Sequence, residues 1–254
     1  MSKIILITGA TSGIGKASAE VFAKKGYDLI ITGRRQKKLN DLSYKLAKKY
    51  AVKTLPLCFD IRILKEVKKA TQKIKGKWKN IDILLNNAGL AKGFHEIHEG
   101  VIEDWDIMID TNLKGLLYMT RMIAPSMVKK KKGHIINIAS VAGKEVYPKG
   151  NVYCATKFAV DALTKAMRID LHKYGLKVSQ VAPGHVEQTE FSLVRFNGDE
   201  DKSKIYQDFK PVNSKDIAKI VYFIASQPKH VNIQDILVMG TQQASSNFIN
   251  RSGR

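Results

Sequence analysis

The 254 residues of the chain are 44% hydrophobic, which suits one large α/β domain with a sizeable core. No apolar run approaches the roughly 18 residues of a membrane span, and the opening "MSKIILIT" is too short for a signal peptide, so we expect a cytoplasmic protein with no membrane partner. Lys and Arg number 43 against 23 Asp and Glu, and this net charge of +20 favours anionic partners. Because the lysines are spread along the chain without a nucleic-acid motif, we expect a solvated basic surface and no nucleic-acid partner.

Strand-like and helix-like patterns alternate along the chain. Short Ile/Leu/Val runs predict seven strands, at residues 3–8, 28–32, 52–60, 81–86, 133–140, 176–184 and 231–239. Helical patterns lie between them, at 16–26, 36–50, about 62–75, 103–129, 151–173 and 213–226. Pro56 predicts that the third strand is irregular. Continuous apolar strands are typical of a sheet covered on both faces, so we predict one α/β domain over residues 1–254, a doubly wound parallel sheet with a polar lid at about 187–210.

The stretch "TGATSGIG" (8–15) lies between the first strand and the first helix. Its Gly9, Gly13 and Gly15 allow a tight turn, a close approach of backbone to a pyrophosphate, and close contact between helix and strand. Their spacing is G-x-x-x-G-x-G, which differs from the G-x-G-x-x-G of the common dinucleotide fingerprint. At the first strand–helix turn of such a sheet, the stretch predicts dinucleotide binding with the pyrophosphate at the helix N-terminus.

The end of the second predicted strand indicates which dinucleotide is bound. NAD-binding sheets usually place Asp or Glu here, where it bonds the ribose 2′-hydroxyl. In "IITGRR", Gly33 takes that position and Arg34 and Arg35 follow. A carboxylate would repel a 2′-phosphate, whereas a guanidinium pairs with it, so we predict NADP. The alternative is that both arginines are solvated charges before a helix.

In "NVYCATKFAV" (151–160), Tyr153 and Lys157 lie four residues apart. On a helix these positions share one face, so the phenol and the ammonium would reach the same point. A surface pair of this kind would do nothing, and it matters only where the fold brings a substrate to it. Cys154 is expected to be a small packing residue and Cys58 a free thiol, and no spacing of His or Cys predicts a metal site.

Together these motifs resemble the short-chain dehydrogenase/reductase family. The resemblance covers nearly the whole chain and rests, in order, on "TGATSGIG", Asp60, "NNAG" (86–89), Asn112, Ser140, the Tyr153/Lys157 pair and "PG" (183–184). Stretches such as "EDWDIMIDTNLKGLLYMTR" and "TEFSLVRFNGD" are similar to the NADP-dependent 3-hydroxy acid dehydrogenases. The resemblance implies a Rossmann-fold oxidoreductase that transfers hydride between NADP(H) and the hydroxyl-bearing carbon of a small 3-hydroxy acid, such as serine, L-allo-threonine or 3-hydroxypropionate.

Two other functions stay open at this point. One is a broad carbonyl or 3-oxoacyl thioester reductase with the same catalytic set. The other is a non-catalytic NADP-binding or nucleic-acid-binding protein, which the positive charge suggests. The intact catalytic set and the lack of a nucleic-acid motif argue against this second alternative.

The resemblance also implies roles for individual residues. Tyr153 is the base that takes the hydroxyl proton, and its ordinary pKa of ~10 is expected to fall beside the Lys157 ammonium and the positively charged nicotinamide. Ser140 holds the substrate oxygen, while Asn112 positions a helix kink and a proton-relay water. Asn86 is expected to serve the sheet. The implied cofactor-binding residues are Gly9, Ala10, Thr11, Ser12, Gly13, Ile14, Gly15, Arg34, Arg35, Asp60, Ile61, Asn87, Ala88, Gly89, Tyr153, Lys157, Pro183, Gly184, Val186 and Thr189.

The substrate's carboxylate needs a cationic partner, since the site would otherwise desolvate a bare charge. Arg195, within the predicted lid, is our candidate for this partner. The alternative is that Arg195 forms a salt bridge with Asp199, Glu200 or Asp201. An apolar wall and a substrate-facing histidine are expected from Phe191, Phe196, Tyr147 and His185.

The family is typically tetrameric, so the resemblance implies a homotetramer. We expect it to assemble through the helices at 103–129 and 151–173 and through the last strand. The apolar residues that fit such an interface, and that would fit an ordinary core too, are Leu113, Leu116, Leu117, Ala155, Ala159 and Leu163.

Overall fold

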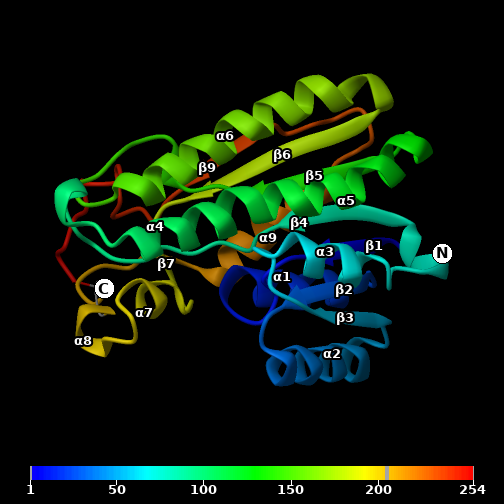
Figure 1. Ribbon diagram of the computed structural model, residues 1–254, viewed down its shortest axis with the longest axis horizontal. Coiled ribbons are helices and arrows are strands. Elements are labelled where there is room, and N and C mark those ends of the chain that lie inside the picture. Colours follow the sequence, from blue (N-terminus) through cyan, green and yellow to red (C-terminus); the bar gives the residue numbers. More distant parts are fainter. Residues whose placement is uncertain (1, 204–205, 254) are drawn as a thin grey trace.

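A seven-stranded parallel sheet forms the centre of the molecule (Figure 1). The computed structural model describes residues 2–203 and 206–253. The strands follow the order β3-β2-β1-β4-β5-β6-β9, and each neighbouring pair runs parallel. Their bounds are β1 Ile4–Ile7, β2 Asp28–Gly33, β3 Thr54–Cys58, β4 Ile81–Asn86, β5 Gly133–Ile138, β6 Leu176–Pro183 and β9 Asp235–Val238. The predicted doubly wound sheet of seven parallel strands is therefore confirmed.

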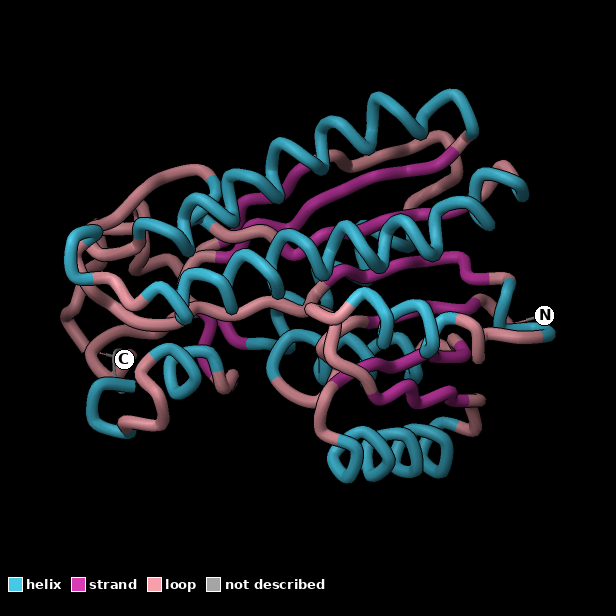
Figure 2. The backbone as a smooth tube through the Cα atoms, in the orientation of Figure 1, coloured by secondary structure: helices cyan, strands magenta, loops and turns pink. Residues whose placement is uncertain are grey.

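Helices cover both faces of the sheet, as Figure 2 shows in cyan around the magenta strands. One apolar core joins the sheet to α1 (Gly13–Lys24), α2 (Gln36–Tyr50) and α9 (Ser214–Ser226), and the other joins it to α3 (Leu64–Thr71), α5 (Gly115–Lys130) and α6 (Asn151–Leu171). Successive residues of β1 alternate between the two cores: Ile5 and Ile7 pack in the first, Ile4 and Leu6 in the second. This burial on two sides explains why the strands are continuously apolar.

Some elements differ from the sequence prediction. The expected irregularity of β3 is wrong, because Pro56 pairs in register with Ile31. Since β3 lies at the edge of the sheet, a missing backbone N–H there can face away from the ladder. The helix predicted at 103–129 consists of α4 (Ile102–Ile109), one π-helical turn (Asp110–Lys114) and α5. The chain therefore places a break in regular helix geometry around Asn112.

Beyond the carboxyl ends of the strands the chain forms a small lobe. Its short strands β7 (Val186–Glu187) and β8 (Val212–Asn213) pair in parallel, and α7 (Phe191–Arg195) and α8 (Glu200–Ser203) lie between them in sequence. Figure 1 places α7 and α8 beside the C-terminus. The predicted lid, 187–210, falls within this lobe, and its residues 204 and 205 lie outside the described residues. In the described part of the chain, no helix is both long and apolar enough to cross a bilayer.

Candidate active site

A cavity of about 710 Å³ opens at the carboxyl ends of the strands. Ligands bind at this edge in doubly wound sheets. The wall of the cavity combines the turn after β1, the end of β2, the loops after β4 and β5, the start of α6 and the segment after β6. Among the predicted site residues, Ala10, Gly15 and Asn112 are not part of this wall, and all the others line it.

The Gly-rich turn has the backbone that the sequence requires. Gly9 has φ +66° and Gly13 has φ +51°, both in the left-handed region that favours glycine. A Cβ on Gly15 would lie 2.3 Å from the Gly9 carbonyl oxygen, so only glycine lets α1 start this close to the turn. Ser12 precedes α1 without capping it through its side chain, which leaves the first N–H groups of the helix available to an anion.

The "NNAG" loop after β4 holds this turn in place. The Asn87 side chain donates to the carbonyls of Thr8 (2.9 Å) and Gly9 (3.2 Å). The Thr8 hydroxyl in turn accepts from the backbone N–H groups of Asn87 and Ala88. Asn86 instead bonds Thr120 and Asn137 in the core, as expected for a residue that serves the sheet.

The end of β2 carries the two predicted phosphate-binding arginines. A Cβ on Gly33 would lie 2.9 Å from the Thr11 methyl, so the turn crowds any larger side chain there. Arg34 is 55% exposed and lies 3.7 Å from the Asp60 carboxylate. Arg35 is hydrogen-bonded to the turn, because its Nη2 donates to the hydroxyls of Thr11 (2.8 Å) and Ser12 (3.1 Å). Arg35 is therefore not a purely solvated charge.

Three of the four predicted catalytic residues meet in the cavity. Tyr153 and Lys157 are buried on α6, and Ser140 is buried just beyond β5. The Lys157 Nζ donates to the Ile138 carbonyl at 3.0 Å and lies 5.9 Å from the centre of the Tyr153 ring. The fold therefore brings the phenol, the ammonium and the hydroxyl to one cavity. Cys154 packs in the apolar cluster beside Tyr153, as predicted.

Asn112 lies inside the π-helical turn, just behind the wall. Its amide donates to the Leu90 carbonyl and its carbonyl accepts from the Leu90 N–H, both at 2.8 Å. The same amide donates to the Thr156 hydroxyl at 3.1 Å. Asn112 thus ties the irregular turn to the loop after β4 and to α6.

Burial shifts the pKa values of both members of the catalytic pair. Desolvation raises the pKa of Tyr153 well above its ordinary value, although a hydrogen bond with Ser140 and the charge of Arg195 act in the opposite direction. Desolvation also lowers the pKa of Lys157 to about 8. The sequence analysis predicted a lowered Tyr153 pKa because it counted nearby charges and left out burial. Among the protein's own groups burial dominates, so the Tyr153 pKa is raised and this prediction is wrong.

Arg195 lines the same cavity. Its side chain is buried, with 8% of the residue exposed. Its Nη1 donates to the Tyr147 hydroxyl at 3.0 Å and its Nε to the Gly93 carbonyl at 3.3 Å. The guanidinium carbon lies 4.6 Å from the centre of the Phe94 ring and 6.0 Å from that of Tyr153. Arg195 is therefore a cation held among aromatic rings beside the predicted base.

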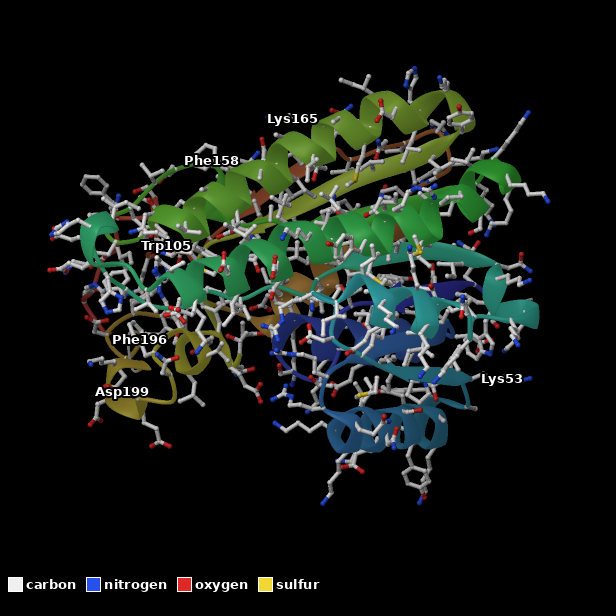
Figure 3. All side chains as sticks on the ribbon, in the orientation of Figure 1. Lys53, Trp105, Phe158, Lys165, Phe196 and Asp199 are labelled. Carbon is white, nitrogen blue, oxygen red and sulfur yellow. The ribbon has the colours of Figure 1, made fainter. Side chains whose placement is uncertain are left out.

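The other predicted wall residues also line the cavity. The Phe191 ring meets the Tyr153 ring edge-on at 5.5 Å, and Phe196, Tyr147 and His185 line the wall as well. Figure 3 labels Phe196 and Asp199 in the small lobe. Asp199, one of the alternative partners suggested for Arg195, pairs with Lys202 at 3.3 Å.

A family model described as short chain dehydrogenase matches residues 3–198. The chain belongs to the short chain dehydrogenase family. It is 42% identical over 242 residues to the NADP-dependent 3-hydroxy acid dehydrogenase YdfG of Salmonella typhi, covering 95% of this chain and 96% of that protein. It is 41% identical over 250 residues to sulfoacetaldehyde reductase 2 of Chromohalobacter salexigens, covering 98% of each. The closed form of serine dehydrogenase complexed with NADP+ is similar at a TM-score of 0.91 and 41% identity, covering 96% of this chain and 97% of that one.

These similarities agree with the geometry. The predicted family, the Rossmann-like fold and the enzyme class, an oxidoreductase acting on CH–OH groups, are confirmed. The two predicted cofactor arginines and the Tyr153/Lys157 pair of this short chain dehydrogenase face one continuous cavity.

Sequence reasoning missed several parts of the wall. Phe94 and Glu190 had a local signal, because Phe94 follows the "NNAG" loop and Glu190 lies within "TEFSLVRFNGD". The tail residues Ser246, Asn247 and Arg251 had none, because that stretch lacks periodicity. Within residues 2–203 and 206–253, no group of three or more His, Cys, Asp or Glu is placed to hold a metal ion.

Proposed function

We propose that this short chain dehydrogenase uses NADP(H) to interconvert a small 3-hydroxy acid, such as serine, L-allo-threonine or 3-hydroxypropionate, and its carbonyl form. The observation that carries the proposal is the buried guanidinium of Arg195 beside Tyr153. A buried cation is costly unless an anion pairs with it. A 3-hydroxy acid, whose carboxylate is separated from the reacting carbon by one carbon, supplies that anion.

The residues present fit NADP. The left-handed glycines and the open N-terminus of α1 form a cradle for a pyrophosphate, and the absence of a Cβ at Gly15 lets α1 begin against the Gly9 carbonyl. Arg34 and Arg35 lie at the end of β2, where a 2′-phosphate needs cations and Gly33 provides no repelling carboxylate. When bound, NADP(H) supplies the hydride chemistry.

The chain's own residues handle the proton and the alignment. Ser140 and Tyr153 hold the substrate oxygen between them, so that the Tyr153 hydroxyl exchanges a proton with it. Lys157, fixed by the Ile138 carbonyl, places a positive charge on the same face of α6 and favours the phenolate. Phe191, packed edge-on against Tyr153, keeps water from one side of the ring.

A second candidate substrate class comes from one of the relatives. Sulfoacetaldehyde reductase 2 is as similar to this chain as the 3-hydroxy acid dehydrogenases are. A sulfonate is an anion that a guanidinium can also pair with, so Arg195 would serve either acid. A broad carbonyl or 3-oxoacyl thioester reductase is the third possibility. An uncharged substrate of that kind would give the Arg195 guanidinium no anion to pair with.

The proposal includes a homotetramer in the cytoplasm, with residues 187–210 as the lid. Leu116 packs in the core, so we no longer include it among the residues expected at the interface between subunits. Leu117, Phe158 and Ile169 of α5 and α6 are exposed large apolar side chains, which support a covered helical face. Figure 3 labels Phe158 and Lys165 on the outer side of α6.

A substrate panel tests the proposal directly. Serine, L-allo-threonine, 3-hydroxypropionate, isethionate and an uncharged alcohol of the same length are each assayed with NADP+ and with NAD+ through the absorbance of the reduced nicotinamide. We expect the 3-hydroxy acids with NADP+ to give the highest kcat/KM. Faster turnover of isethionate would move the assignment to the sulfonate class. Equal turnover of the uncharged alcohol would overturn the role of an acidic group.

A further inference from the structure

A carboxylate of the small lobe pairs with Arg35, one of the two arginines predicted for the 2′-phosphate, and with the nearby Lys38. Glu190 Oε2 is 2.6 Å from Arg35 Nη1, and Glu190 Oε1 is 3.0 Å from Lys38 Nζ. The Glu190 side chain is 34% exposed and lines the cavity. This contact is not local, since Arg35 and Glu190 are 155 positions apart in the sequence. The fold brings this carboxylate to the adenosine end of the cavity.

Of these two cations, Arg35 lines the cavity at the Gly-rich turn, and Lys38 lies beside it on α2. Arg35 also donates to Thr11 and Ser12 of the Gly-rich turn, so it is fixed there rather than free to swing. Arg34 lies 3.7 Å from the Asp60 carboxylate, which it shares with Arg62. Glu190 is therefore the counter-charge of Arg35 and Lys38 in particular.

The neighbours of Glu190 reach two other parts of the site. A Cβ on Gly13 would lie 3.2 Å from the Thr189 side chain, so Thr189 covers the turn. Phe191 meets the ring of Tyr153. Three consecutive residues thus run from the Gly-rich turn, past the cations, to the predicted base.

We propose that the Glu190 carboxylate is an internal substitute for the 2′-phosphate of NADP: it occupies Arg35 and Lys38, and NADP must displace it, whereas NAD need not. This inference rests on the proposed use of NADP. Hydrogen bonds from Lys38 and Arg35 outweigh the effect of burial and hold the pKa of Glu190 below its ordinary value, so the carboxylate is charged at neutral pH. A 2′-phosphate adds about two negative charges next to it, and like charges that share cations repel.

The competition limits the preference for NADP. Removing the charge of Glu190 frees both cations for the 2′-phosphate and leaves a ligand without that phosphate nearly unaffected. The displaced carboxylate also releases residues 189–191 from α2, so the adenosine phosphate influences a segment that touches Tyr153.

Binding measurements on Glu190→Gln test this without relying on turnover. Isothermal titration calorimetry gives the Kd of the full-length protein for NADP+, NAD+, adenosine 2′,5′-bisphosphate and 5′-AMP. Gln keeps the size of the side chain and removes its charge. Since two partly exposed ion pairs are lost, we expect the ratio of NAD+ Kd to NADP+ Kd to rise about 3- to 30-fold, with NAD+ changing less than about twofold. The bisphosphate and 5′-AMP, which lack nicotinamide, should follow the same pattern.

Asp199→Asn is the matched control, because it removes the same charge from the same lobe but from a pair with Lys202. It should leave the ratio unchanged. If the wild-type protein prefers NADP+ and Glu190→Gln leaves the Kd ratio unchanged or lowers it, the proposed role of Glu190 is overturned while the proposed cofactor stands. If Glu190→Gln weakens the binding of all four ligands equally, Glu190 only holds the lobe in place, and the proposed role is again overturned. Wild-type protein that binds NADP+ no tighter than NAD+ removes the proposed cofactor instead.

Discussion

Arg195→Met is the change that most directly tests the proposed substrate class. Met keeps the length of the side chain and removes its charge. The guanidinium is almost fully buried in the cavity wall, where water cannot replace it as a partner of a substrate carboxylate. Removing one member of a buried charge pair costs about 2–5 kcal/mol, which is about a 30- to 4000-fold loss in kcat/KM.

The assay compares two substrates in each protein. The kcat/KM of a 3-hydroxy acid is divided by that of an uncharged alcohol of the same length, so that general damage to the site cancels. We expect Arg195→Met to lower this ratio by about 30- to 4000-fold. Tyr147→Phe is the matched control, since it removes the hydroxyl that accepts from Nη1 but keeps the cation. The loss of one neutral acceptor should lower the ratio by no more than about tenfold.

The reasoning is refuted if Arg195→Met leaves the ratio of the two substrates unchanged while the wild-type protein favours the acid. The carboxylate would then be held elsewhere, and the guanidinium would serve only to join the Gly93 carbonyl to Tyr147.

Two further outcomes are expected. Tyr153→Phe keeps the ring but removes the hydroxyl that we propose transfers the proton, so turnover should fall on the order of 10²–10⁴-fold while NADP+ binding changes little; near-native turnover would exclude Tyr153 as the base. Light scattering at micromolar concentration should give the mass of a tetramer, and Phe158→Asp on the exposed face of α6 should dissociate it. A wild-type monomer would contradict the proposed assembly.

The fold was predictable because its signals are local. The inner strands β2, β1, β4, β5 and β6 are largely buried on both faces, and this leaves mostly apolar runs between turn residues, as in Ile4–Ile7 before the Gly-rich turn. Pro56 misled the prediction, since its effect depends on the position of β3 in the sheet, and a single strand does not reveal that it lies at the edge.

Spacing alone predicted parts of the site only within short motifs. Tyr153 and Lys157 share a helix turn, and Gly9, Gly13 and Gly15 share one loop, so spacing alone brings them together. The surroundings of Arg195 come from residues 93–94, 147 and 153, and the partner of Arg35 comes from the small lobe. These long-range contacts follow from the packing of the whole chain, and no local sequence pattern predicts them.

The sign of the Tyr153 pKa shift shows what charge counting leaves out. Burial disfavours both the phenolate and the ammonium, so it raises the pKa of Tyr153 and lowers that of Lys157. A buried site therefore needs further positive charge before Tyr153 can act as a base. Arg195 already provides some, since its charge lowers the pKa of Tyr153. A substrate carboxylate that pairs with Arg195 would offset this effect as it binds, and Lys157, 5.9 Å from the ring centre, would still place a cation beside the phenol. The arginine that we propose selects the acid is thus also coupled to the proposed base, so its surroundings matter as much as its charge.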